Sequence, residues 1–265
     1  MTKFNFIILI FIFLLLGCEK VIDVDLNDAN PVLVIEGSLT EQHNSAVVKI
    51  SETTSYFNAD PAEPVTGAVV KITDDDGREY HLQEKNGMYL SDDIYPGYNT
   101  TYILSVEVNG TIYQSASKWH KTVLIDSLST HINEEYSVFQ EGYNVSLYFH
   151  DPPHENNYYR LKVYLNGELE NNPEDFIFFN DNNTNGKFVE LRIRRKVFEI
   201  GDTVTYELQT LDKAAYEYFD AISELIDDNS AATAAPANPV PNFTNGALGC
   251  FSAYSSDKKT IIISK

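Results

Sequence analysis

The stretch YILSVEVNGTIYQS, residues 102–115, reads as two short strands joined by Asn109-Gly110. An Asn-Gly pair supplies the two positive φ angles that a tight hairpin turn requires. Further strand-like apolar runs precede it at 32–37, 46–50, 68–72 and 88–90, separated by turns such as Asp74-Asp75-Asp76-Gly77 and Asn86-Gly87. Short strands with spaced turns and no helical periodicity predict an antiparallel β-sandwich over residues 31–118.

A second set of strand-like runs follows at 145–149, 158–165, 176–179, 188–197 and 203–211, and a last one at 259–264. The segment 212–227 differs, because it carries its apolar side chains on one helical face: Ala215, Tyr218, Phe219, Ile222, Leu225 and Ile226. Asp212 suits the N-cap of this helix. We therefore expect a second β-rich domain over residues 119–265, with helix 212–227 packed on a sheet.

The predicted fold class is mainly β. Residues 67–77 and 87–89 resemble in composition the carboxypeptidase-regulatory or transthyretin-like sandwiches. The whole expectation is an N-terminal Ig-like or transthyretin-like antiparallel sandwich followed by a second β-rich domain with one packed α-helix. This resemblance is generic, so it implies a fold and no activity.

The first eighteen residues have the features of a secretory signal. Lys3 gives a positive start, and an unbroken apolar run of eleven residues covers Phe6–Leu16. A helix of that length, at about 1.5 Å per residue, is too short to cross a hydrocarbon core of about 30 Å. Leu15-Leu16-Gly17-Cys18 resembles a bacterial lipobox, although a plain signal peptide with an incidental cysteine gives the same pattern. The lipobox implies removal of residues 1–17 and lipid attachment to Cys18, with residues 18–30 as a tether.

Composition and charge narrow the possible partners. The chain has 39 acidic and 19 basic residues, a net charge of −20, and 43% of its residues are hydrophobic. A nucleic-acid-binding protein needs a positive surface, so the sequence predicts no nucleic-acid partner. A lipidated Cys18 leaves Cys250 without a disulfide partner, and the apolar neighbours of Cys250 indicate a buried thiol rather than a nucleophile.

Three polar stretches are candidates for metal or catalytic sites. Asp181-x-Asn183-x-Asn185-Gly186 places oxygen ligands at alternate positions, as a calcium loop does, but Arg192 stands where an EF-hand has its bidentate Glu. Asn-Gly turn chemistry explains the same residues, and the choice stays open. Asp74-Asp75-Asp76-Gly77 is expected to form a hairpin turn, and His150–Glu155 a solvated loop. We predict no metal site and no cofactor.

Aromatic residues are the remaining candidates for a binding surface. Tyr95 and Tyr98 lie in a turn and are weak candidates for contact with a ligand, whereas Trp119 and Tyr158-Tyr159 are more typical of a β core. The chain lacks the Gly-x-Ser-x-Gly, His-Glu-x-x-His and phosphate-loop motifs. We therefore predict no catalytic residue.

Several short motifs, taken in their order along the chain, resemble a known family. They are Val21-Ile22-Asp23-Val24-Asp25-Leu26, Val34-Ile35-Glu36-Gly37, Gly67-Ala68-Val69, Tyr113-Gln114-Ser115, Asn157-Tyr158-Tyr159-Arg160, Asn245-Gly246-Ala247-Leu248-Gly249 and Phe251-Ser252-Ala253-Tyr254. This order is similar to that of the domain-of-unknown-function (DUF) 4249 family of Bacteroidota lipoproteins. The resemblance implies a lipid-anchored outer-membrane protein, often encoded near a TonB-dependent receptor, and it implies no catalytic residues.

These observations lead to one expected function and two alternatives. We expect a non-enzymatic outer-membrane lipoprotein that binds a ligand or partner as an accessory of a TonB-dependent uptake system. The first alternative is a structural or adhesive surface module. The second is a hydrolase assembled from distant carboxylates, for which two carboxylates facing each other across a cleft would be the sign.

Overall fold

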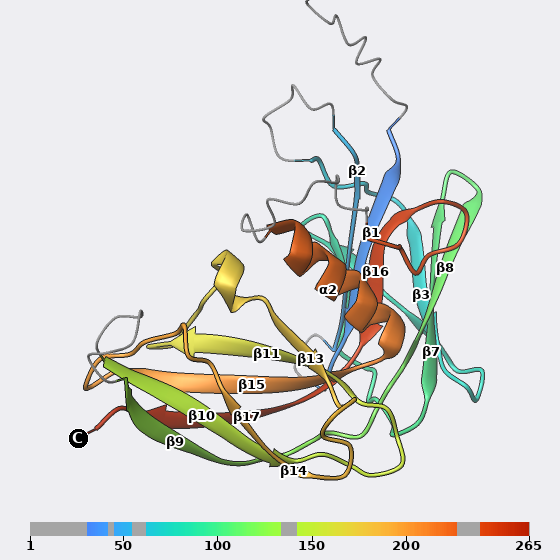
Figure 1. The fold of residues 1–265 in the computed structure, drawn as a ribbon. Coiled ribbons are helices and arrows are strands. Elements are labelled where there is room, and N and C mark those ends of the chain that lie inside the picture. Colours follow the sequence, from blue (N-terminus) through green and yellow to red (C-terminus); the bar gives the residue numbers. More distant parts are fainter. Residues whose placement is uncertain (1–30, 42–44, 55–61, 134–141, 227–238, 265) are drawn as a thin grey trace, which may run out of the picture.

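The computed structural model describes residues 31–41, 45–54, 62–133, 142–226 and 239–264. Cys18, the expected signal peptide and the expected tether lie outside the described residues. Within them the chain is mainly β, with several antiparallel sheets and a single α-helix, which confirms the predicted fold class (Figure 1). No helix in this described part of the chain is both long enough and apolar enough to span a membrane.

Nine strands build the first sandwich: β1 Leu33–Leu39, β2 Ala46–Glu52, β3 Val69–Thr73, β4 Glu79–His81, β5 Gln83–Lys85, β6 Met88–Ser91, β7 Thr101–Val108, β8 Thr111–Lys118 and β16 Leu248–Ala253. One sheet has the order β16-β1-β2-β6-β5 and the other β4-β3-β7-β8. Ile35, Val48 and Leu104 are among the buried side chains that fill the core between them. The φ angles of Asn109 and Gly110 are 51° and 79°, as the predicted β7–β8 hairpin requires.

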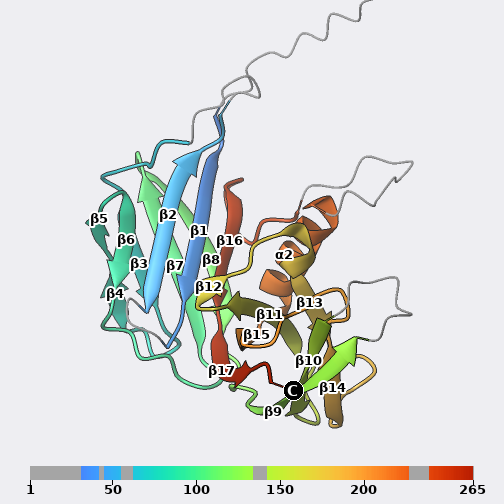
Figure 2. The ribbon, with the colours of Figure 1, turned by 90° about the vertical axis from the view of Figure 1, so that its left-hand side faces the viewer.

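β16 brings the far end of the chain into this first sandwich. It pairs in parallel with β1, from Val34 opposite Leu248 to Leu39 opposite Ala253, and Figure 2 shows the two strands side by side. Gly249 permits the approach, because its φ is +99° and a Cβ there would lie 2.0 Å from the carbonyl oxygen of Ile35. The predicted second domain takes in all residues after 118, so the sequence does not predict that β16 joins the first sandwich. A local sequence pattern does not say which sheet a strand joins.

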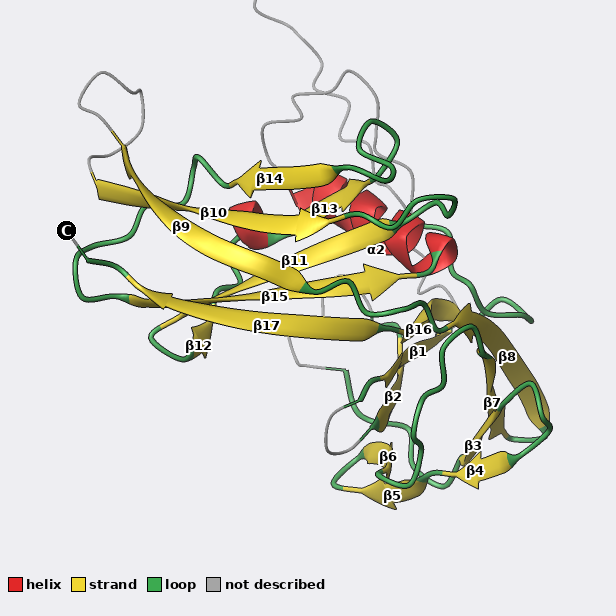
Figure 3. Ribbon diagram, turned by 90° about the horizontal axis from the view of Figure 1, so that it is seen from below, coloured by secondary structure: helices red, strands yellow, loops and turns green. Residues whose placement is uncertain are grey.

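The second unit contains β9 Ile125–Asn133, β10 Gly142–His150, β11 Tyr158–Leu165, β12 Glu168–Leu169, the 3-10 helix η1 Pro173–Asp175, β13 Ile177–Asn180, β14 Phe188–Arg192, β15 Thr203–Leu211 and β17 Ser255–Ile262. One sheet has the order β14-β10-β9. The other has the order β12-β11-β15-β17, and β13 also pairs with β11 (Figure 3). Leu147, Phe149, Leu161 and Tyr206 belong to a separate hydrophobic core for this unit.

The helix α2, Lys213–Ile226, lies between the two units (Figure 1). Asp212 caps it as predicted, because its Oδ1 accepts a hydrogen bond of 2.9 Å from the backbone N–H of Ala215. The other carboxylate oxygen accepts a hydrogen bond from Ser117 Oγ on β8, which in turn accepts one of 2.8 Å from the N–H of Ala253. These buried bonds join the start of α2 to both sheets of the first sandwich.

Candidate functional site

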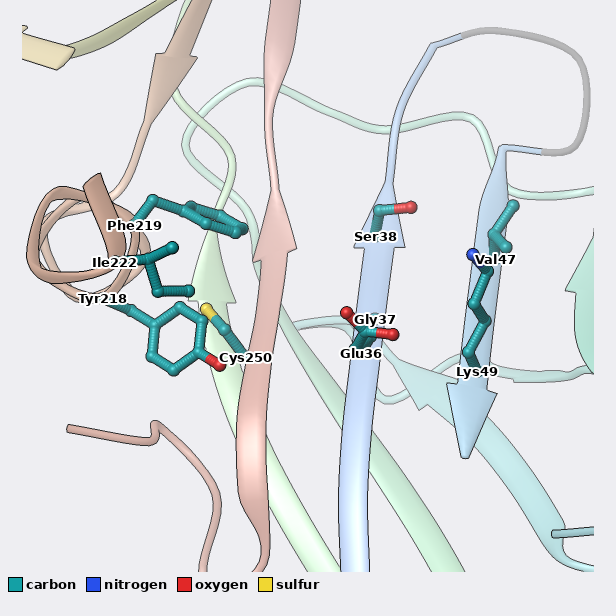
Figure 4. Close-up of a pocket in the computed structure, with 9 residues that line it drawn as sticks. All are labelled: Glu36, Gly37, Ser38, Val47, Lys49, Tyr218, Phe219, Ile222 and Cys250. Carbon is teal, nitrogen blue, oxygen red and sulfur yellow. The ribbon is translucent and has the colours of Figure 1, made fainter. Parts of the chain in front are cut away.

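A cavity of about 360 Å³ separates α2 from the outer face of the sheet that contains β1, β2 and β16 (Figure 4). Its volume lies in the range of sites that bind small molecules. It is lined by Glu36, Gly37, Ser38, Val47, Lys49, Tyr218, Phe219, Ile222 and Cys250. Three segments far apart in the sequence therefore contribute to one site.

The strand register sets the floor of the cavity. Side chains alternate across a strand, so Glu36 points outward from β1 while its neighbours in the strand alternate toward the core. Glu36 lies opposite Lys49 on β2 and opposite Cys250 on β16. Ser38 and Val47 form the next pair along the same face. The floor thus combines one carboxylate, one ammonium group and small or apolar side chains.

Helix α2 supplies the aromatic and apolar wall. Tyr218 and Ile222 are one turn apart and share a helical face, and Figure 4 shows both beside Cys250. Burial raises the pKa of the Tyr218 hydroxyl, and the neighbouring Cys250 and Glu36 raise it further. The hydroxyl therefore remains protonated at neutral pH and can donate a hydrogen bond to a ligand.

The chemistry of this cavity favours binding over bond cleavage. Cys250 is 5% exposed, and burial raises the pKa of its thiol, so it is the buried, protonated thiol that the sequence indicated and not a thiolate nucleophile. Glu36 is the one carboxylate among the described lining residues. Cleavage by paired carboxylates requires a second carboxylate across the cleft.

Tyr95 and Tyr98 lie away from this cavity. Their side chains are 87% and 61% exposed, and the Tyr98 hydroxyl donates a hydrogen bond of 3.4 Å to Glu155 Oε1. Their role in ligand contact stays a prediction. Trp119 and Tyr159, by contrast, are 2% and 0% exposed and belong to the two cores, as the β context favoured.

The polar side chains of the 150–155 loop diverge to different partners. His150 Nδ1 lies 2.6 Å from Asp126 Oδ2, on the neighbouring strand. Asp151 is buried and accepts hydrogen bonds from the Tyr159 hydroxyl, at 2.6 Å, and from the N–H of Gly186, at 2.9 Å. Burial raises the pKa of this carboxyl. The loop therefore does not gather its His and carboxylate groups around one point.

The loops 74–77 and 181–186 use their aspartate carboxylates for hydrogen bonds within the turns. Asp74 Oδ1 accepts hydrogen bonds from the N–H groups of Asp76 and Arg78, at 3.0 and 2.9 Å. Asp181 Oδ2 accepts one of 2.9 Å from the Asn185 side-chain amide. Among the residues that the structure describes, no group of three or more His, Cys, Asp or Glu side chains could hold a metal ion.

The sequence predicted the amphipathic helix but not the cavity beside it. One feature of the sequence does indicate a second partner for the helix. Tyr218 and Phe219 are adjacent, so they point about 100° apart around the helix, and a helix with large aromatics in both directions needs two partners. The structure provides both partners, because Tyr218 faces the cavity while Phe219 also stacks on Phe178 of β13, with ring centroids 6.1 Å apart.

Comparison with known proteins adds a family and no activity. A search of curated proteins finds no similar sequence. The model of a family described as domain of unknown function (DUF4249) matches residues 19–260, which is nearly the whole chain. The protein with this cavity between a capped helix and a β-sandwich therefore belongs to the DUF4249 family.

Proposed function

We propose that this protein is a non-enzymatic binding lipoprotein, held in the outer membrane through Cys18, which serves as an accessory of a TonB-dependent uptake system. The observation that carries the binding role is the cavity between α2 and the first sandwich. The anchor and the uptake system rest on the Leu15-Leu16-Gly17-Cys18 motif and on the resemblance of the ordered motifs to a family of outer-membrane lipoproteins.

The lining of the cavity supports binding of a small molecule. Ligand sites are mostly apolar and aromatic, with a few polar groups that fix orientation. Here Tyr218, Phe219 and Ile222 supply the apolar surface, while Glu36 and Lys49 supply opposite charges on the floor. A lone carboxylate does not favour the alternative of a hydrolase with two facing carboxylates.

The partner is tested by purifying the tagged full-length protein from gently solubilised outer membranes and identifying associated proteins by mass spectrometry. We expect a β-barrel receptor to co-purify with the tagged protein in stoichiometric amount. The Cys18→Ala variant is the control, and it is expected to leave the membrane fraction and lose the receptor. Abundant intact protein without a partner would argue instead for a free-standing structural or adhesive module.

The cavity is tested by native mass spectrometry of protein purified from its own membranes. We expect the wild type to carry a small-molecule adduct. Ile222→Trp fills the cavity and should remove the adduct, whereas Glu224→Trp, at an exposed position about 200° around the same helix, should retain it. An adduct retained by Ile222→Trp would place the ligand elsewhere.

A further inference from the structure

Arg160 and Lys162 form a basic pair on the outer face of the second unit, beside α2. Both lie on β11, where Tyr159, Leu161 and Val163 alternate with them and point into the core. Arg160 and Lys162 therefore share the opposite face of the sheet, and both are half-buried.

Two aromatic rings hold the guanidinium of Arg160. Its Cζ lies 5.5 Å from the centre of the Phe178 ring and 5.2 Å from that of the Phe219 ring. These two rings are nearly parallel, with an angle of 10° between their planes. Cation–π contacts of this kind orient a guanidinium without occupying its N–H donors, so those donors stay available for an acceptor.

Neither member of the basic pair has an anionic partner among the described residues, which sets the pair apart. Four other Lys and Arg side chains in the described part of the chain are half-buried, and each has an acceptor: Lys71 on Glu79 at 2.5 Å, Arg192 on Glu190 at 3.3 Å, Lys196 on Asp175 at 2.7 Å, and Lys259 on the carbonyl oxygens of Ile125 and Asp126 at 2.9 and 2.8 Å. Within the described residues, no carboxylate oxygen lies within 4.0 Å of a side-chain nitrogen of Arg160 or Lys162.

The carboxylate of Glu207, which lies near the basic pair, already has other partners. Glu207 lies opposite Lys162 on β15 and is 3% exposed. It accepts hydrogen bonds of 2.7 Å from both the Tyr164 hydroxyl and the Gln209 amide, and it lies 3.1 Å from Lys258 Nζ. Burial lowers the pKa of both Arg160 and Lys162, and the charge of Arg160 lowers that of Lys162 further; the charge of Glu207 raises both but does not outweigh burial.

A half-buried cation without an anion is costly, and this chain carries 39 carboxylate side chains from which a partner could have been drawn. We propose that Arg160 and Lys162 bind the oxyanion of a ligand, a carboxylate or a phosphate. The planar guanidinium fits either group with two parallel hydrogen bonds, and Lys162 adds a second positive charge. Phe178 and Phe219 lie beside the pair and would pack against an apolar part of the same ligand. The site adjoins the cavity through Phe219 but rests on its own observations.

The full-length protein in detergent is titrated with inorganic phosphate and, separately, with benzoate, at ionic strength held constant with chloride. Binding is measured by calorimetry and by the shift of the Arg160 Nε–Hε resonance. We expect saturable binding of at least one probe. Arg160→Gln and Lys162→Gln should each weaken it at least tenfold, which is about 1.4 kcal/mol. Arg195→Gln removes the same charge from an exposed arginine of the same unit and should leave it unchanged.

The two probes distinguish the sources of the oxyanion. Saturation by phosphate alone assigns a phosphate-bearing ligand, saturation by benzoate alone assigns a carboxylate, and saturation by both assigns a site for either. Absence of saturable binding of both probes would overturn the proposal. An equal loss in Arg195→Gln would overturn it too, because the binding would then reflect overall charge. Arg160→Lys keeps the positive charge but loses the planar guanidinium and its two parallel hydrogen bonds, so it should weaken binding less than Arg160→Gln.

Discussion

Lys162 and Lys196 are half-buried lysines of the same unit with opposite surroundings. Lys196 Nζ lies 2.5 Å from Glu170 Oε2 and 2.7 Å from Asp175 Oδ1, and the side chain is 13% exposed. Burial lowers the pKa of Lys196, but the two carboxylates outweigh burial and the pKa is raised overall. For Lys162, burial and the charge of Arg160 act together, and the pKa is lowered.

The buried charge of Lys196 stabilises the fold, whereas the buried charge of Lys162 does not. Lys196 lies in a network with two carboxylates of the same chain, Glu170 and Asp175. The cost of burying the ammonium group is therefore offset within the protein. Lys162 and Arg160 are held by strand register and aromatic rings, neither has an ion-pair partner among the described residues, and Glu207 offsets their burial only in part. An identical substitution should therefore lower stability at Lys196 and leave it unchanged or raise it at Lys162.

The largest effect is expected for Lys196→Met. The substitution leaves Glu170 and the fully buried Asp175 without their cation, and an unpaired buried carboxylate is strongly unfavourable. We expect the free energy of unfolding to fall by about 3 kcal/mol. Urea unfolding checks this as a lower midpoint with an unchanged slope. A loss below about 0.5 kcal/mol would mean that the network is no stronger than an exposed ion pair.

Glu207→Gln should have an intermediate effect. It removes the one negative charge near the basic pair and weakens the hydrogen bonds from Tyr164 and Gln209, so the free energy of unfolding should fall by about 2 kcal/mol. The same change removes repulsion toward an incoming oxyanion, so phosphate or benzoate should bind several times more tightly. Glu168→Gln, an exposed residue of the same unit, is the control and should alter neither quantity.

The strand pattern of the second unit was predictable in part, where local chemistry decides it; β9 was not among the predicted runs, and β14 ends at Arg192 rather than at 197. β15 covers 203–211 as predicted, since Asp202 and Asp212 bound a run that alternates apolar and polar residues and Asp212 caps the next helix. The partner of β16 was not predictable. Its parallel pairing with β1 depends on the close contact of Gly249 with the Ile35 carbonyl, across more than two hundred residues of sequence.

Lys162→Met should leave stability unchanged or raise it by up to about 1 kcal/mol, because it removes a charge whose burial Glu207 offsets only in part. The apolar stem is kept, so packing on β11 is preserved. The comparison with Lys196→Met is matched in chemistry, and urea unfolding measures both. A loss above about 1 kcal/mol would show that Lys162 is compensated within the chain, which would remove the support for the oxyanion site.

The candidate sites were less predictable than the strands. Tyr95 and Tyr98 stood out in the sequence as turn aromatics, yet the cavity forms where Tyr218 meets the outer face of β1 and β16. Arg160 was visible only as part of a family motif. Its lack of an ion-pair partner among the described residues is a property of three-dimensional neighbours, which the 39 carboxylates in the sequence do not indicate.

The smallest effect is a difference in pH dependence between the two lysines. The pKa of Lys162 is lowered in the folded state, so between that pKa and the ordinary value near 10.4 the unfolded chain binds more protons and stability rises with pH. The advantage of Lys162→Met over wild type should therefore be largest below the folded-state pKa of Lys162 and disappear as the pH approaches about 10.4. The pKa of Lys196 is raised, so its contribution to stability is fully present below about 10.4 and is lost only at higher pH.

Urea unfolding of both variants from pH 7 to 11 checks both signs. The free energies are taken as differences from wild type, so that the titration of tyrosines common to all variants cancels. Parallel curves for the two variants would mean that the lysines share one environment, against the contacts seen here.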